Sequence, residues 1–207
     1  MIAGSLALTA LIGGQLAASA DGSMNVTIMA QQDGAWGGAP LGSGTTDTVA
    51  SAGCAITSVT MMLRYYGINT DPGAINSWLS ANGGYAFGDQ LIWDSITAYT
   101  GGRVTFSGWL GPDLDVIHNE LDAGRPVVAE VSLYGNQHFV LLTGYSTEGG
   151  LTANDPWFAD SVSFADRYGP AGVVSIRTFM PADPAGARGG GRVSWTANAA
   201  GSLHLAR

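Results

Sequence analysis

The sequence is organised around residues 51–67, which read Ser51-Ala52-Gly53-Cys54-Ala55-Ile56-Thr57-Ser58-Val59-Thr60-Met61-Met62-Leu63-Arg64-Tyr65-Tyr66-Gly67. Apolar residues recur at spacings of three, four and three from Ile56 to Tyr66, which predicts a helix with one apolar face. Gly67 is a favourable position for the helix to end. Cys54 is therefore expected at the helix N-terminus, where unpaired N–H groups and the helix dipole favour an anion.

This position leaves two interpretations of the cysteine open. A thiol at a helix N-terminus ionises more readily than a free one, and the thiolate is the nucleophilic form. A lone cysteine is also often a small buried apolar residue with no chemical role. Cys54 is the only cysteine of the chain, so no internal disulfide can form, and cysteine pairing says nothing about the redox compartment.

The composition describes a folded protein with an acidic balance. The chain has 207 residues, of which 46% are hydrophobic and 12% charged, with a net charge of −8 and no lysine. This supports one ordinary domain with extensions. It argues against nucleic acid as a partner, because phosphates require a basic face. The 31 glycines predict many turns and a loop-rich fold.

The two ends of the chain differ from its centre. Residues 2–20 carry no charge and end in Ala18-Ser19-Ala20, the small-x-small form of a signal-peptidase site, although no basic residue precedes the apolar stretch. Central glycines weaken this stretch as a membrane span. We expect residues 1–22 to be a signal-like or N-terminal apolar segment, 23–182 the folded domain and 183–207 a Gly/Ala-rich tail. The protein is accordingly expected to be secreted or extracytoplasmic, without a stable membrane span.

Helical patterns precede strand patterns along the domain. Helices are expected at residues 72–79, 90–99 and 113–122 in addition to the cysteine helix. Strands are expected at 25–30, 104–110, 127–133, 138–145, 151–154 and 173–180. Helices followed by an antiparallel sheet predict an α+β fold.

Three histidines are possible partners for the cysteine. His204 lies in the tail, and His118 lies beside the apolar stripe of its helix, so we expect it to be solvated. His138 opens an apolar strand, where a polar side chain needs a partner. A histidine with a purely structural hydrogen bond is the alternative interpretation.

The hairpin that follows His138 suggests that partner. The strand turns at residues 146–149 and returns to Asp155, and positions 138 and 155 are equally far from the turn centre. Such residues face each other on one side of an antiparallel pair. His138 and Asp155 are therefore predicted to be neighbours, with Asn154 on the opposite face. Pro156 restricts Asp155 to extended conformations.

These residues suit nucleophilic catalysis. A carboxylate orients an imidazole and stabilises its cation, and an imidazolium beside a thiol favours the thiolate. Cys54, His138 and Asp155 are thus a candidate nucleophile, base and orienting residue. The backbone N–H of Cys54 and a side-chain amide, from Gln31 or Gln32, are candidate donors to an oxyanion. A surface glutamine with no such role is the alternative.

Four motifs in this order resemble a known family. They are Gln31-Gln32-Asp33-Gly34-Ala35-Trp36, then Gly53-Cys54 with Tyr65-Tyr66-Gly67, then His138-Phe139-Val140 with Gly144, and Asn154-Asp155-Pro156. Residues 25–180 resemble the papain-like cysteine peptidases of the bacteriocin-processing, double-glycine-leader type, especially their stand-alone secreted or phage-associated relatives. The segment from Asp71-Pro72 to Trp78-Leu79 is similar as well.

The resemblance implies a papain-like fold, with a central nucleophile helix packed on an antiparallel sheet, and a cysteine peptidase that needs no cofactor or metal. It implies Cys54 as nucleophile, His138 as base, Asp155 as orienting residue and Gln31 as the oxyanion-hole glutamine. Gln31 is preferred over Gln32 because its spacing to Asp33 and Trp36 fits the family. The implied substrate is a peptide leader or a bacterial cell-wall (peptidoglycan) peptide.

Other functions remain open at this point. The same fold can serve as a non-catalytic peptide-binding module or as a structural component, for example of a phage particle. The same triad can also support transglutaminase or amidase chemistry, since fold and triad do not fix the acyl acceptor. A metal enzyme is not expected, because the acidic pairs Asp113/Asp115 and Asp155/Asp160 have no histidine or cysteine at ligand spacing.

Overall fold

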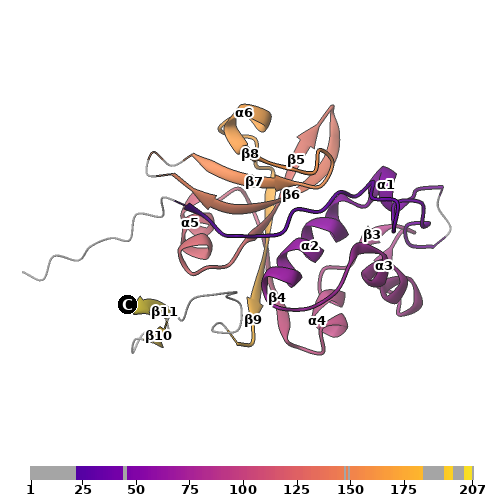
Figure 1. The fold of residues 1–207 in the computed structure, drawn as a ribbon, viewed down its shortest axis with the longest axis horizontal. Helices are drawn as coiled ribbons and strands as arrows, with labels where there is room; N and C mark the ends of the chain where they lie inside the picture. The colour runs from indigo at the N-terminus through magenta and orange to yellow at the C-terminus, as the bar shows by residue number, and fades with distance from the viewer. Residues whose placement is uncertain are drawn as a thin grey trace, which may run out of the picture.

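The fold is seen in a computed structural model that describes residues 22–43, 46–146, 148, 150–183, 194–197 and 203–206 (Figure 1). The expected signal-like segment up to residue 21, and most of the expected tail, lie outside the described residues. In the tail, β10 (Ser194–Ala197) pairs with β11 (Leu203–Ala206). Within the described ranges, none of the helices is both long and apolar enough to cross a bilayer.

The helical part is built around the predicted cysteine helix. After the short α1 (Val49–Ala52), α2 runs over Cys54–Tyr65 and is buried on almost all sides. The next helix, α3 (Pro72–Ala81), begins as the sequence predicts, with the Asp71 carboxylate accepting a hydrogen bond from the Ala74 N–H at 2.8 Å.

The helix expected over residues 90–99 is only partly correct. Its first residues form strand β3 (Gln90–Leu91), which pairs with β2 (Tyr85–Ala86), and helix α4 is confined to Ser95–Tyr99. The reason is the turn between the strands, where Phe87 has φ +51° and Gly88 has φ +100°. Two consecutive residues with positive φ reverse the chain into a hairpin and prevent an early helix start.

The later half of the chain supplies six strands of a seven-stranded sheet whose pairings are all antiparallel. Their order is β4-β9-β5-β6-β7-β8, and β1 from the start of the chain is attached to β6. Its strands are β1 (Gly22–Ser23), β4 (Val104–Leu110), β5 (Val127–Leu133), β6 (Asn136–Tyr145), β7 (Leu151–Asp155), β8 (Asp160–Ser163) and β9 (Ser175–Pro181). The four long strands match the prediction closely, and β8 was not expected. Helices followed by a mostly antiparallel sheet confirm the α+β class and are consistent with a papain-like fold.

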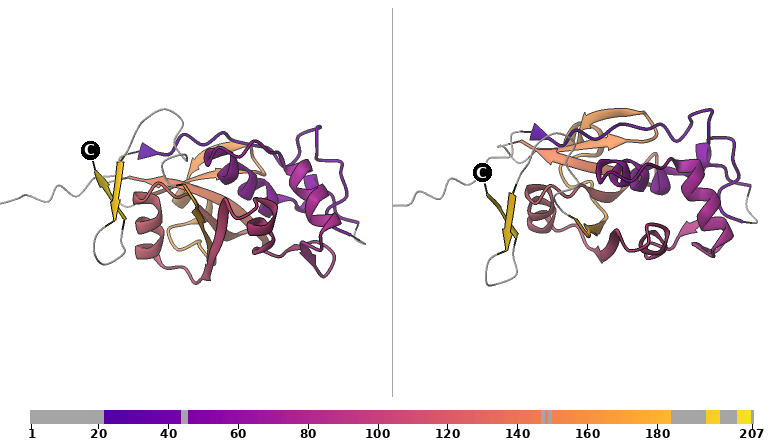
Figure 2. Two further views of the ribbon diagram at one scale, coloured as in Figure 1. Left: turned by 90° about the horizontal axis from the view of Figure 1, so that it is seen from below. Right: turned by 60° about the horizontal axis from the view of Figure 1, so that its bottom comes forward.

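The strand expected at residues 25–30 is wrong. This segment runs from β1 along the sheet toward the helical part without joining a ladder (Figures 1 and 2). It is held by separate hydrogen bonds, from the Met24 N–H to the Thr143 carbonyl at 2.7 Å and from Asn154 Nδ2 to the Val26 carbonyl at 3.3 Å.

The strand β6 separates two apolar clusters. Phe139 and Leu141 pack in the cluster that contains α2, whereas Val140 and Leu142 pack with Ile117 of α5 (Leu114–Asp122). The second cluster also includes residues of α6 (Phe164–Tyr168), a helix that was not predicted. This alternation is the expected pattern of a strand buried on both faces. It fixes α2 against one face of β6.

The register of the β6–β7 hairpin differs from the prediction by two residues. Asn154 lies opposite Leu141 rather than Phe139, and a register shift follows between Leu142 and Gly144. The connecting loop is longer than expected, since the Ser146 N–H bonds to the Gly150 carbonyl at 2.9 Å. Because an even shift keeps each residue on its original face, the predicted contact between the histidine and the aspartate is preserved.

Candidate active site

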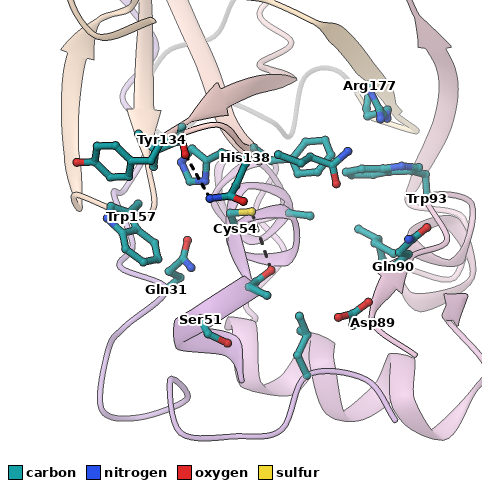
Figure 3. Close-up of a pocket in the computed structure, with 18 of the residues that line it drawn as sticks. Gln31, Ser51, Cys54, Asp89, Gln90, Trp93, Tyr134, His138, Trp157 and Arg177 are labelled. Atoms are coloured by element: carbon teal, nitrogen blue, oxygen red, sulfur yellow. Dashed lines mark hydrogen bonds between the residues drawn. The ribbon is translucent and has the colours of Figure 1, made fainter. Parts of the chain in front are cut away.

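The candidate nucleophile lies at a tight junction between two helices. Gly53 ends α1, donating its N–H to the Val49 carbonyl at 2.9 Å, and Cys54 begins α2 directly afterwards. A Cβ on residue 53 would lie 2.5 Å from the Val49 oxygen, so only glycine fits without a backbone shift. Cys54 is 8% exposed and lines a cavity of about 480 Å³ (Figure 3).

The start of α2 is fastened to the histidine strand. One turn after the cysteine, Ser58 Oγ donates a buried hydrogen bond of 3.1 Å to the Phe139 carbonyl. This bond places the first turns of α2 beside the first residues of β6. His138 therefore lines the same cavity as Cys54, and Figure 3 shows the two side chains next to each other.

His138 and Asp155 form a buried pair. His138 Nε2 lies 2.9 Å from Asp155 Oδ1, and the two residues are 3% and 0% exposed. The predicted contact is therefore confirmed, and Nδ1 is the ring nitrogen that remains for the thiol. Burial lowers the pKa of His138, but the hydrogen bond to Asp155 and the interaction with the Cys54 side chain outweigh it and raise this pKa to about 9. The imidazole is therefore mostly protonated at neutral pH.

The carboxylate of Asp155 is surrounded by donors. Besides His138, it accepts hydrogen bonds from the Trp157 N–H at 2.9 Å, from Arg167 Nη1 at 3.1 Å and from the Tyr168 hydroxyl. Burial raises the pKa of Asp155, but these bonds, led by the one from His138, lower it to about 2. Asp155 is therefore ionised at any pH where the protein is expected to work.

Sequence reasoning missed Arg167 and Tyr168. Both belong to α6, in a mostly polar stretch with only Phe164 fully buried, so no apolar period marked a helix there. Arg167 is held by two further bonds to Asp160, at 2.6 and 2.7 Å. The available signal was indirect: a buried carboxylate needs positive or hydrogen-bonding partners, and Arg167 is the first basic residue after Asp155.

Gln31, rather than Gln32, lies at the cavity. Gln31 is 1% exposed and lines the cavity, whereas Gln32 is exposed. The Gln31 N–H bonds to the Pro156 carbonyl at 2.9 Å, and its Nε2 donates to the Ala50 carbonyl at 2.9 Å. One N–H of this amide is thus used to fix the side chain, and the second remains as a donor.

Aromatic side chains form much of the cavity wall. Trp93, Trp109, Tyr134 and Trp157 all line it. Arg177 is buried beneath two of them, with its guanidinium carbon 4.9 Å from the centre of the Trp93 ring and 3.9 Å from that of Trp109. None of these wall residues was among the sequence-predicted site residues.

Of the two other histidines, the one whose side chain the structure describes lies outside this site. His118 was expected to be solvated, but it is half-buried and stacks on Tyr145 with ring centres 4.2 Å apart. The side chain of His204 lies outside what the structure describes. In the described part of the chain, no group of three histidine, cysteine or acidic side chains is placed to hold a metal ion.

The comparison with protein families agrees with the fold and the motifs. Residues 23–176 match the Peptidase_C39 like family, so the chain belongs to this bacteriocin-processing peptidase-like family. The resemblance inferred from the four motifs is therefore confirmed. No curated protein matches the chain. Membership implies a peptide as substrate, while the roles of individual residues rest on the arguments below.

Proposed function

We propose that this protein is a cysteine peptidase that hydrolyses a peptide bond through an acyl-enzyme on Cys54. The observation that carries the proposal is the buried ion pair of His138 and Asp155 beside a cysteine at a helix N-terminus, with Cys54 and His138 lining one cavity. A purely structural cysteine needs none of these neighbours. The cavity gives a substrate access to the thiol.

The first half of the reaction forms the thioester. A thiol beside the imidazolium of His138 ionises readily, and the thiolate attacks the carbonyl carbon of the substrate. The negative charge that develops on the carbonyl oxygen is stabilised by the N–H of Cys54, which has no intrahelical acceptor, and by the second N–H of Gln31. The C–N bond then breaks as His138 Nδ1 donates its proton to the leaving amine.

The second half regenerates the enzyme. His138, now neutral, takes a proton from a water molecule that attacks the thioester carbonyl. The C–S bond breaks, the carboxylic acid product leaves, and the thiolate and imidazolium are restored. Asp155 remains ionised throughout, holding the ring by Nε2 and stabilising its cation.

The class of substrate is inferred from the family and from the residues that line the cavity. A peptide leader and a bacterial cell-wall peptide both fit a cleft lined by aromatic and amide side chains. The uncharged N-terminal stretch supports a secreted or extracytoplasmic protein, and association with a phage particle is the second possibility that the family resemblance offers. Peptide binding without catalysis, or a structural role, is favoured instead if Cys54 and His138 are found not to interact.

The test is the rate at which iodoacetamide modifies Cys54 as a function of pH, measured by intact mass in the wild type and in His138→Ala. The wild type should react well below the ordinary thiol pKa of ~8.5, and the variant should lose this low-pH reactivity. His118→Ala is the matched control, because it removes a half-buried histidine that stacks on Tyr145 instead. Equal pH profiles in the wild type and His138→Ala would favour the non-catalytic alternative.

A further inference from the structure

We propose that Asp89 forms a subsite for a cationic side chain of the peptide substrate. The proposal rests on the peptidase function above and names a feature of its substrate. The subsite would take the ammonium group of lysine, of a related diamino acid in a cell-wall peptide, or a guanidinium group. It would disfavour an acidic residue at the same place.

Asp89 faces the reactive cysteine across the cavity. It lines the same cavity as Cys54 and is half-buried. Figure 3 shows its carboxylate directed into the cavity, on the side of Cys54 away from Trp157 and Tyr134. Within the described ranges, its carboxylate has no hydrogen bond or ion pair. Arg177, a basic residue of the same cavity wall, is already paired with Glu130 at 3.0 Å.

The turn that carries Asp89 is held in place by a neighbouring loop. Asp89 follows Phe87 and Gly88, and the Gly88 carbonyl accepts a hydrogen bond from the Ser43 N–H at 2.8 Å. Gly42 has φ +66°, and a Cβ there would lie 1.9 Å from the Gly88 oxygen. The loop and the hairpin turn therefore meet in a contact that only glycine allows.

A buried amide completes the support. Asn76 is 4% exposed, and its Oδ1 accepts bonds from the Gly42 N–H at 3.2 Å and from the Tyr85 hydroxyl at 2.9 Å. Its Nδ2 donates to the Pro40 carbonyl at 2.8 Å. One side chain thus ties the loop to strand β2, which leads into the turn. A carboxylate on such a support is preorganised, so a ligand does not have to order it.

The surroundings favour a cation at this carboxylate. Asp89 is only partly hydrated, and an unpaired carboxylate in a half-buried site gains a charge-assisted hydrogen bond when an ammonium group binds. Trp93 lies on the same side of Cys54, where an aliphatic stem can pack against its ring (Figure 3). Phe87 keeps a left-handed backbone with φ +51° although it is bulky, and such conformations concentrate at functional sites.

The geometry also indicates which part of the substrate this is. His138 has to reach the leaving nitrogen, and its strand β6 begins directly after the hairpin tip that carries Tyr134. The leaving amine is therefore expected on the Tyr134 and Trp157 side, and the acyl part of the peptide extends toward Asp89. An electrophilic peptide that contains only the acyl part is consequently a suitable probe.

The experiment measures the labelling of Cys54 by acetylated tetra-alanyl vinyl sulfones in which one alanine at a time is replaced by Lys, Nε-acetyl-Lys or Glu. At one position, the Lys probe should label at least about tenfold faster than its acetylated counterpart, the effect of one charge-assisted hydrogen bond. Asp89→Asn should remove this preference, and Asp89→Lys should shift it to the Glu probe. Asp115→Asn, an equal charge change on exposed α5, should leave it intact.

Iodoacetamide is too small to contact Asp89 while it reacts with Cys54. Its rate therefore tests the peptidase proposal independently of the subsite proposal. Each peptide-probe rate is divided by the iodoacetamide rate of the same protein, so that a general change in thiol reactivity in Asp89→Asn is not read as a change in the subsite. If the Lys and acetyl-Lys probes label equally while iodoacetamide still depends on His138, the subsite is wrong and the peptidase proposal stands. If iodoacetamide does not depend on His138, and no peptide probe labels Cys54, both proposals fail.

A binding measurement distinguishes a linear peptide from a cell-wall peptide as the ligand that carries the cationic side chain. Cys54→Ala is titrated calorimetrically with a lysine-containing linear peptide and with a soluble lysine-containing muropeptide. The ligand that the subsite recognises, whether the linear peptide or the muropeptide, should bind about tenfold more weakly once its lysine is acetylated. If acetylation changes neither affinity, the cationic subsite is refuted for both ligands.

Discussion

Replacing Asp155 by Asn should switch His138 from a mostly charged to a mostly neutral state at neutral pH. The rise of the His138 pKa from 6.5 to about 9 corresponds to about 3 kcal/mol in favour of the imidazolium. Burial acts in the opposite direction, so the attraction from Asp155 and Cys54 exceeds this net value. Once the carboxylate and the thiol are both removed, burial is the cause that remains, and the pKa should fall below 6.5.

The assay is an NMR titration of isotope-labelled histidine in Cys54→Ala and in Cys54→Ala with Asp155→Asn, so that no thiol titrates alongside. His138→Asn assigns the signal by its absence. In the Cys54→Ala protein the signal should titrate well above pH 6.5, and in the double variant below it. A change of less than about half a unit between the two would show that Asp155 does not set the charge of His138.

The same pair predicts a pH dependence of stability. Because the folded-state pKa of His138 is raised, its contribution is complete below pH 6.5 and is lost as the pH rises through about 9. The free energy of unfolding of Cys54→Ala, measured with urea, should therefore fall as the pH rises above 6.5, over a narrower window because the Cys54 contribution to this pKa is removed. In the double variant with Asp155→Asn the fall should be absent. A parallel decline in both proteins would refute the assignment.

Three further predictions concern other parts of the site. Gly53→Ala should destabilise the fold by about 2 kcal/mol and slow the alkylation of Cys54, because the new Cβ would meet a backbone oxygen at 2.5 Å; urea unfolding and iodoacetamide rates measure both effects. Arg177→Met should cost about 2 kcal/mol, since it removes the buried partner of the half-buried Glu130, and the double variant with Glu130→Gln should cost less than the sum in a double-mutant cycle. The lowered pKa of Asp155 implies stability that is present above pH 3.8 and lost toward about pH 2, so wild type and Asp155→Asn should converge in urea stability as the pH falls.

Each of these predictions has a direct control. Gly38→Ala places a Cβ in open space and should leave both stability and alkylation unchanged. If Gly53→Ala behaves the same way, the tight junction is not what orients the cysteine. Additive effects in the Arg177 cycle would mean that the ion pair carries no coupling, and an acid-independent difference between wild type and Asp155→Asn would contradict the lowered pKa.

The sequence was most informative where apolar spacing and local signals agreed. The helix after Cys54 could be predicted from the spacing of its apolar residues, although its burial extends to almost all sides. The strands at residues 104–110 and 127–133 could be predicted as apolar runs with glycine or proline near their ends. The pair of His138 and Asp155 could be predicted because hairpin geometry relates positions across a turn. Even an error of two residues in register left the two side chains on one face.

The remainder depended on contacts that no local pattern reveals. The segment 25–30 has strand-like composition, but its hydrogen bonds go to separate partners, such as Asn154 Nδ2, which donates to the Val26 carbonyl, rather than to a ladder. The hairpin before α4 results from the positive φ at Phe87. Phenylalanine rarely adopts this conformation, so the sequence does not indicate a turn there. Arg167 and Asp89 are charged residues of the kind that usually lies on the surface. The folded chain shows that Arg167 bonds to Asp155 and that Asp89 lines the cavity.

The order of strands in the large sheet has a consequence for synthesis of the protein. Strand β9, the last of this sheet in the chain, is inserted between β4 and β5, and it contributes Arg177 beneath the cavity wall. Gln31 likewise depends on a hydrogen bond to Pro156, far along the chain. A nascent chain that has not yet released Pro181 from the ribosome therefore cannot close its sheet. During translation the thiol would remain without its completed surroundings, so a ribosome-bound chain should be inactive until its final strand is free to enter.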